Sequence, residues 1–252
     1  MRQRLITLFS TACMLSAQSF EVATVKPTPE DWQGGRYLRM TGPQRFVATN
    51  YTPRVLIATA YSLNPRAVEG GPAWMDSEHF NTVAATPGEA QPTLDQQLSM
   101  VRGLLADRFK LAFHRVDREM PVYVLSLAKG GSKLQETSAR LAEQPDIVSR
   151  IGPDEVRLPA RNATMQQFAA VLQRSVFDRP MLDQTGLTGR YDFDLEWTPD
   201  ETQFDGLRRA LQESTEPTLF TALQEQLGLK LESTRALVSV IAIDRIERPS
   251  EN

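Results

Sequence analysis

Residues 45–52 read RFVATNYT, and residues 157–164 read RLPARNAT. Arg, Ala, Asn and Thr recur at the same spacing in these two stretches. Each stretch leads into the same succession of patterns, which is how an internal repeat shows itself in a sequence. We therefore expect the chain to contain two copies of one supersecondary unit.

A helix is predicted directly after each stretch. Thr52 can cap a helix whose first position is Pro53, and Thr164 can form a capping box with Gln167. Apolar residues then recur at helical spacing, at Leu56, Ile57, Ala60 and Tyr61 in one copy and at Met165, Phe168, Ala169 and Leu172 in the other. These patterns predict two equivalent amphipathic helices.

A strand, a turn and a second strand follow in both copies. The stretches are AVEGGPAW (67–74) with HFNTVAAT (79–86), and PMLDQTGLTG (180–189) with YDFDLEW (191–197). A second helix comes next, capped by Thr93 with Gln96 in the first copy and opened by Pro217 in the second, where it ends at Gly228. Two closing strands complete each copy, predicted at 109–115 and 122–129 and at 229–233 and 238–247.

The pattern βαββαββ is thus traversed twice. It predicts an α+β protein of two tandem βαββαββ domains related by internal duplication, with helices packed on small mixed sheets. The expected divisions are a signal peptide at 1–19, a first domain at 20–129 with an extra N-terminal strand (FEVATVK), a linker at 130–154 and a second domain at 155–252. Residues 199–216 are expected to form a long loop.

The N-terminus has the layout of a cleavable signal peptide. Arg2 and Arg4 precede an apolar run that ends at the small-residue site Ala17-Gln18-Ser19. This run is shorter than the roughly 20 residues that a membrane anchor needs. Cleavage would also remove Cys13, the only cysteine. We expect an exported protein, periplasmic or extracellular, with no transmembrane segment after cleavage.

Several stretches resemble an uncharacterised family of secreted, soil-associated bacterial proteins. The resemblance rests on FEVATVKP, GGPAW, LLADRFKL, DQTGLTGRYDFDLEWTPD and FTALQEQLGLKLESTRA. It implies export and supplies no reaction, because that family is known as a domain of unknown function. In some members of the family that this chain resembles, the domain is joined to a membrane-embedded zinc metallopeptidase of the antibiotic-sensor class. The resemblance therefore implies a sensing or ligand-presenting role outside the membrane.

Each half also resembles the short N-terminal domains of secretins and TonB-dependent transducers. Those domains share the βαββαββ order and carry a Leu pair or a Gly-Leu before the last hairpin, as Leu104-Leu105 and Gly228-Leu229 do here. The resemblance implies a docking module whose partner is an envelope or membrane protein.

Composition and motifs give little support to catalysis. The 28 basic and 31 acidic residues nearly balance, so nucleic acid is not an expected partner. The two histidines, His79 and His114, lie outside any metal-binding motif, and no nucleotide-binding motif occurs. We predict no metal and no cofactor, and we expect both histidines to be exposed structural residues.

The candidate interaction or turn motifs lie at corresponding points of the two copies. Asp183 is expected to bond its own backbone two residues on, and Gly186 and Gly189 can adopt positive φ. The two tryptophans are either binding anchors or core residues, and burial is the commoner role. The residues are Gly70, Gly71, Pro72, Trp74, Asp183, Thr185, Gly186, Gly189 and Trp197.

Two functions remain open from the sequence. The first is an exported, non-catalytic interaction or sensing module that docks a protein or ligand through a sheet edge, a helix groove or the two turns. The alternative is a secreted hydrolase that pairs carboxylates, from Asp183, Asp192 or Asp194, in a cleft between the domains. Asp192, Asp194 and Glu196 alternate with apolar residues. This pattern usually indicates a solvated strand face, and a cation site is the alternative interpretation.

Overall fold

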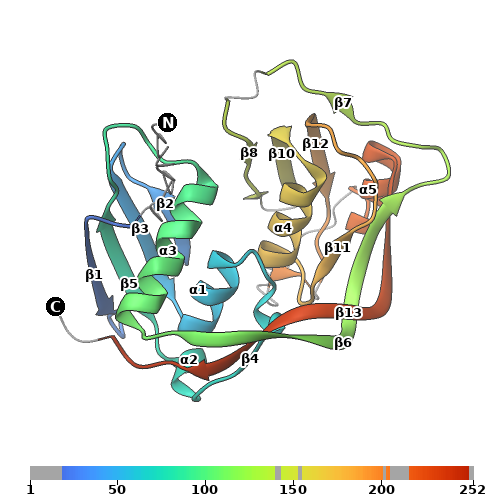
Figure 1. The fold of residues 1–252 in the computed structure, drawn as a ribbon. Helices are drawn as coiled ribbons and strands as arrows, with labels where there is room; N and C mark the ends of the chain where they lie inside the picture. The colour runs from blue at the N-terminus through green and yellow to red at the C-terminus, as the bar shows by residue number, and fades with distance from the viewer. Residues whose placement is uncertain (1–18, 140–142, 153–154, 201–202, 205–215, 250–252) are drawn as a thin grey trace, which may run out of the picture.

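The computed structural model describes residues 19–139, 143–152, 155–200, 203–204 and 216–249. Within these residues the protein is α+β, with helices packed against three small sheets (Figure 1). The predicted signal peptide up to residue 18, and most of the predicted loop at 199–216, lie outside the described residues.

The first sheet is antiparallel and carries two helices on one face. Its order is β1-β5-β3-β2, and its elements are β1 (Val22–Pro27), β2 (Tyr37–Met40), β3 (Arg45–Tyr51), α1 (Pro53–Ala60), β5 (Phe80–Ala85) and α3 (Leu94–Arg108). Thr52 caps α1, and Thr93 forms the predicted capping box with Gln96. Both helices pack on this sheet around Phe46 and Phe80.

The second sheet is also antiparallel and lies in the other half of the chain. It has the order β7-β12-β10-β8, with β9 also paired to β10. Thr164 and Gln167 form the predicted capping box of α4, while Thr218, one residue after the predicted Pro217, caps α5. The elements are β7 (Gln135–Glu136), β8 (Asp146–Ile147), β9 (Arg150–Ile151), β10 (Val156–Ala163), α4 (Met165–Ser175), β12 (Tyr191–Trp197) and α5 (Leu219–Leu227).

A third sheet joins the two halves. It has the order β11-β6-β13-β4 and contains β4 (Val68–Gly70), β6 (Ala112–Leu127), β11 (Met181–Asp183) and β13 (Leu229–Arg245). The long strands β6 and β13 pair antiparallel along their length and run from one helix-covered sheet to the other (Figure 1). Each short strand runs parallel to the long strand of the opposite half, β4 to β13 and β11 to β6.

The prediction of two closing strands in each copy is wrong. Each predicted pair is one continuous strand, and Phe109 caps the end of α3 instead of opening a strand. The middle of β6 is held by ion pairs from exposed side chains, Arg118 to Glu69 at 3.1 Å and Arg235 to Glu119 at 3.2 Å. These polar residues resemble a loop in sequence because they do not alternate with apolar ones.

Two further short helices were not predicted. The 3₁₀ helix η1 (Pro65–Ala67) follows the side-chain cap of Asn64, and α2 (Trp74–Ser77) lies between β4 and β5.

Each long strand contributes buried residues to the core of the other half of the chain, where residue 129 divides the two halves. Tyr123 and Leu125 of β6 belong to the core of the second half, and Ile241 of β13 belongs to the core of the first. Val122, Val238 and Val240 form a small cluster between them. Strand pairing and core packing thus both cross the predicted domain boundary. The boundary, like the internal duplication, stays a prediction.

None of the helices among the described residues has both the length and the apolar composition needed to span a bilayer.

Candidate docking groove

One wall of the candidate groove is the polar side of helix α4. Phe168 and Leu172 of this helix turn into the second core. Gln166, Ala170 and Gln173 lie at helical spacing on another side and line the groove. The helix therefore presents an apolar stripe to the core and amide groups to the groove.

The second wall is β11 with the turn that follows it. The Asp183 carboxylate accepts hydrogen bonds from the Thr185 N–H and hydroxyl, at 3.0 Å and 2.8 Å. The predicted bond from Asp183 to the backbone two residues on is thereby confirmed. Gly186 has a φ of 70°, in the left-handed region that favours glycine.

Gly189 plays a different part from the one predicted. Its φ does not lie in the left-handed region, so the prediction of a positive φ is wrong here. A Cβ at this position would lie 2.7 Å from the Tyr191 hydroxyl. Glycine is thus required by the close approach of the tyrosine ring.

Together these walls enclose a half-open groove with a volume of about 680 Å³. Ser62, in the turn after α1, lines it from the first half of the chain. Among the residues that the structure describes, Asp183 is the only charged one in the lining, which otherwise combines hydroxyl and amide groups with apolar side chains. The groove is therefore suited to groups that exchange hydrogen bonds with amides.

Of the lining residues, Asp183 alone was predicted as a site residue; Ser62, Gln166 and Gln173 are among those that were not. The spacing of the two glutamines on a predicted helix could have indicated a shared polar face. No local signal places Ser62 beside them, because it comes from the other half of the chain.

The GGP turn of the first half is a packing feature. Gly70 and Gly71 have φ values of 74° and 80°. A Cβ on Gly71 would lie 2.2 Å from the Met75 sulfur, and Pro72 begins the turn into α2. These residues thus allow β4 and α2 to pack closely.

The two tryptophans differ in environment. Trp197 is 0% exposed, and its indole N–H donates to Gln203 Oε1 at 2.8 Å. Trp74 is half-buried, with its ring edge-on to Phe80 and the Arg248 guanidinium 5.0 Å from its centroid. Trp197 is therefore a core residue, and Trp74 lies between core and surface.

The carboxylates of β12 alternate with buried apolar residues, and each has a partner. Asp192 accepts from the Asn162 N–H at 2.8 Å and from the Thr137 hydroxyl at 3.0 Å. Arg161 donates to both carboxylate oxygens of Asp194. Asp183 lies in a different sheet from these two residues. The structure thus assigns the β12 carboxylates to turn and strand contacts.

Three glutamates offer ligand atoms within 4.8 Å of one another, namely Glu155, Glu196 and Glu216. The Arg157 guanidinium lies 2.6 Å from Glu155 and 3.5 Å from Glu196. A cation therefore already neutralises part of this cluster.

Both histidines are exposed. His114 pairs with Asp244 at 2.8 Å, and His79 lies 3.3 Å from the Asn50 carbonyl.

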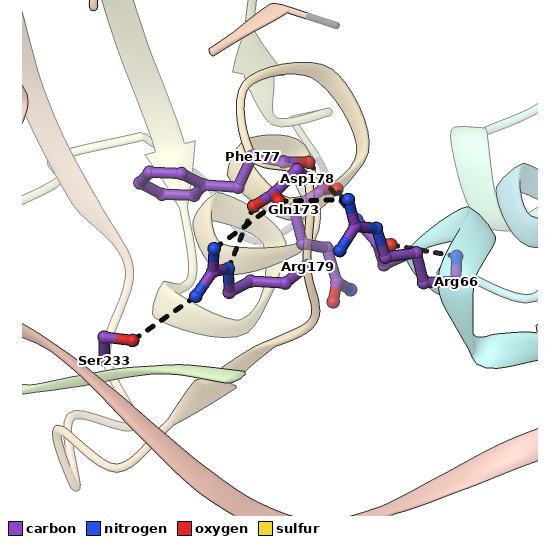
Figure 2. A network of polar contacts seen from close by, with 7 residues as sticks. Arg66, Gln173, Phe177, Asp178, Arg179 and Ser233 are labelled. Carbon is purple, nitrogen blue, oxygen red and sulfur yellow. Dashed lines mark hydrogen bonds and ion pairs between the residues drawn. The ribbon is translucent and has the colours of Figure 1, made fainter. Parts of the chain in front are cut away.

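A network of polar contacts fixes the two halves next to the groove (Figure 2). The Asn64 amide donates to the carbonyls of Gln173 and Phe177 at 2.7 Å and 3.2 Å, near the end of α4. The Gln173 side chain in turn donates to the Ser62 carbonyl at 2.8 Å and accepts from the Met181 N–H at 3.1 Å. These bonds set the position of α4 relative to α1 and β11.

Partly buried ion pairs extend this network toward β13. Arg66 pairs with Asp178 at 3.1 Å, and Arg179 also pairs with Asp178, at 2.9 Å (Figure 2). The Arg179 guanidinium lies 4.9 Å from the centroid of the Tyr123 ring. Burial raises the pKa of the Tyr123 phenol, and the positive charge of Arg179 opposes that rise.

Replacing Asn64 by alanine is expected to lower the free energy of unfolding by about 2–3 kcal/mol, because buried backbone groups lose their partners. Asn64 is 2% exposed and also accepts from the Arg66 N–H. Chemical denaturation measures the change. Arg66→Gln is the control, since an exposed ion pair contributes less than about 1 kcal/mol. Equal effects of the two substitutions would contradict this assignment.

The fold and the groove define a class of α+β protein in which a helix face, a strand edge and a turn form one surface. The chain belongs to the family described as Protein of unknown function (DUF3738), whose model matches residues 54–246. No curated protein matches the chain. No solved structure matches it either.

Proposed function

We propose that this protein is an exported, non-catalytic interaction module that docks a partner outside the cytoplasm through the groove between α4 and the turn after β11. One observation carries the proposal: the groove places a sheet edge, an element to which extended peptides commonly add as a strand, beside two hydrogen-bonding surfaces. The edge is β11, and the two surfaces are the polar side of α4 and the turn held by Asp183 and Thr185.

The chemistry of the lining agrees with docking. Its amide and hydroxyl groups can exchange hydrogen bonds with a polypeptide, and its apolar residues can bury side chains. The carboxylates of the alternative hydrolase hypothesis have partners that account for their positions. We therefore favour docking over paired-carboxylate hydrolysis.

The partner is proposed to be an envelope or membrane protein, in keeping with the resemblance to secretin and transducer domains. Internal duplication is part of the same proposal. Its support is that Asn50 and Asn162 both have positive φ at a β-bulge. The Asn50 N–H donates to the side-chain oxygen of Asn81, and the Asn162 N–H donates to that of Asp192.

Site-specific photocrosslinking in the cell envelope tests this function. A photoreactive residue in place of Thr188, in the groove, is expected to capture one defined envelope protein. The same residue in place of exposed Gln224 on α5 is the control. Capture of the same proteins from both positions, or of nothing but a second copy of this chain, would contradict the proposal.

A further inference from the structure

The third sheet has two edge strands, and the first of them is closed by an arginine. Arg54 of α1 donates to the carbonyls of Val68 and Gly70, the two residues of β4 that face away from β13. Arg54 is itself paired with Asp76. The outward hydrogen-bonding groups of β4 are therefore occupied by a side chain of the same protein, which is one way that edges are protected.

The second edge, β11, is left open. Its pairing with β6 uses the Pro180 carbonyl and the Gln184 N–H, so Met181 and Asp183 direct their backbone groups to the other side, where the groove lies. Gln173 occupies the Met181 N–H. Since β6 is the only strand paired with β11 among the described residues, the Met181 carbonyl and the Asp183 N–H and carbonyl face the groove.

The arginine that closes β4 has no counterpart at the corresponding position beside β11. Arg54 is the second residue after the Thr52 cap of α1, and Gln166 is the second residue after the Thr164 cap of α4. Gln166 is exposed and lines the groove. A neutral amide thus stands where the other half has the arginine that closes its strand edge.

The charge of the groove indicates what can bind beside this edge. Asp183 is exposed, and no other charged residue lines the groove within the described part of the chain. One of its carboxylate oxygens accepts from Thr185, which leaves the second oxygen, Oδ2, to face other groups. A cation placed along the β11 edge would meet this carboxylate with no positive charge of the lining to oppose it.

We propose that β11 receives an extended segment of a partner protein, which adds a strand to this sheet and places a lysine or arginine side chain at Asp183. The segment donates a backbone N–H to the Met181 carbonyl and exchanges backbone hydrogen bonds with Asp183, and Gln166 and Gln184 lie beside it. The inference rests on the proposed docking function and names the chemistry of the docked segment.

Synthetic peptides test the inference by fluorescence polarisation with the purified protein. The probe is a capped peptide of about eight residues, a common strand length, with alternating Thr and Val and a central Lys. Methylating the peptide's backbone nitrogens that face β11 is expected to weaken binding about tenfold or more. Each lost hydrogen bond removes up to about one power of ten in affinity. Replacing the central Lys by Gln is expected to weaken binding by a smaller factor.

Two variants locate the binding edge. Gln166→Arg should close β11 as Arg54 closes β4, and should weaken binding of both the Lys and the Gln peptide about tenfold. The matched control is Gln224→Arg, the same change at an exposed position of α5, which should leave binding unchanged. Asp183→Asn should remove the preference for Lys over Gln while the effect of backbone methylation persists.

The inference is overturned if no peptide binds, or if binding is insensitive to backbone methylation and to Gln166→Arg. A free lysine derivative that binds as tightly as the peptide would also overturn it, because the backbone would then contribute nothing. Photocrosslinking at Thr188 decides the docking function separately. Capture of a partner there, together with failure of the peptides, would overturn only the strand-addition inference.

Discussion

Residues 20–129, expressed without the rest of the chain, are expected to remain largely unfolded. This fragment lacks β13, which supplies Ile241 to the first core and is the pairing partner of β4 and β6. Strand β6 would then expose apolar residues such as Val122 and Leu125, which are 0% exposed in the full chain. Folded domains are stable by only about 5–15 kcal/mol. The fragment therefore cannot offset the loss of the strand pairing and core contacts that β13 supplies.

Circular dichroism and the dispersion of amide resonances measure this outcome, with the full chain as the control. A second fragment, residues 130–252, should restore dispersed resonances when the two are refolded together, because it carries β13. Cooperative unfolding of the isolated first fragment would contradict the expectation and would support an independent domain at 20–129.

Replacing Trp197 by alanine is expected to lower the free energy of unfolding by about 3–5 kcal/mol, the range found for buried aromatic residues. The indole is fully buried, stacks on Phe204 with centroids 6.4 Å apart and satisfies Gln203. Its removal would leave both a cavity and an unpaired buried amide. Denaturant titration of the purified variant measures the loss.

Trp74→Ala is the matched control for this substitution. Trp74, in α2 of the first half, is half-buried and covered in part by Arg248. The expected loss is well below that of Trp197, because less apolar area is taken from water. Equal losses would mean that burial does not separate the two tryptophans.

The longer helices α1, α3, α4 and α5 could be predicted from the sequence because their signals are local. Thr93 with Gln96, and Thr164 with Gln167, make the bonds that their spacing predicts. The alternation in YDFDLEW likewise gives β12, with its apolar residues buried. Such signals depend only on residues within one or two turns of each other.

The long strands could not be predicted in the same way. The segment around Arg118 and Glu119 is exposed and is stabilised by side chains that come from β4 and β13. Alternation of apolar residues requires one face to be buried, and here the strand passes between two cores. The sequence therefore suggests a break where the backbone is continuous.

The groove shows the same limit. The turn bond of Asp183 was predictable because both partners lie within two residues. The position of α4 relative to Ser62 depends instead on Asn64 and Gln173, which lie far apart in the chain and meet only in the folded protein. Residue spacing within either segment carries no information about that meeting.

The exchange of strands between the halves also fixes when the first core can form. Val68 pairs with Ile241, so the first half waits until β13 has been synthesised. Contacts between residues so distant in sequence form slowly, because a long loop must close before they are made. The nascent chain should therefore lack a completed first core until β13 has emerged, in an incompletely folded state that chaperones can bind.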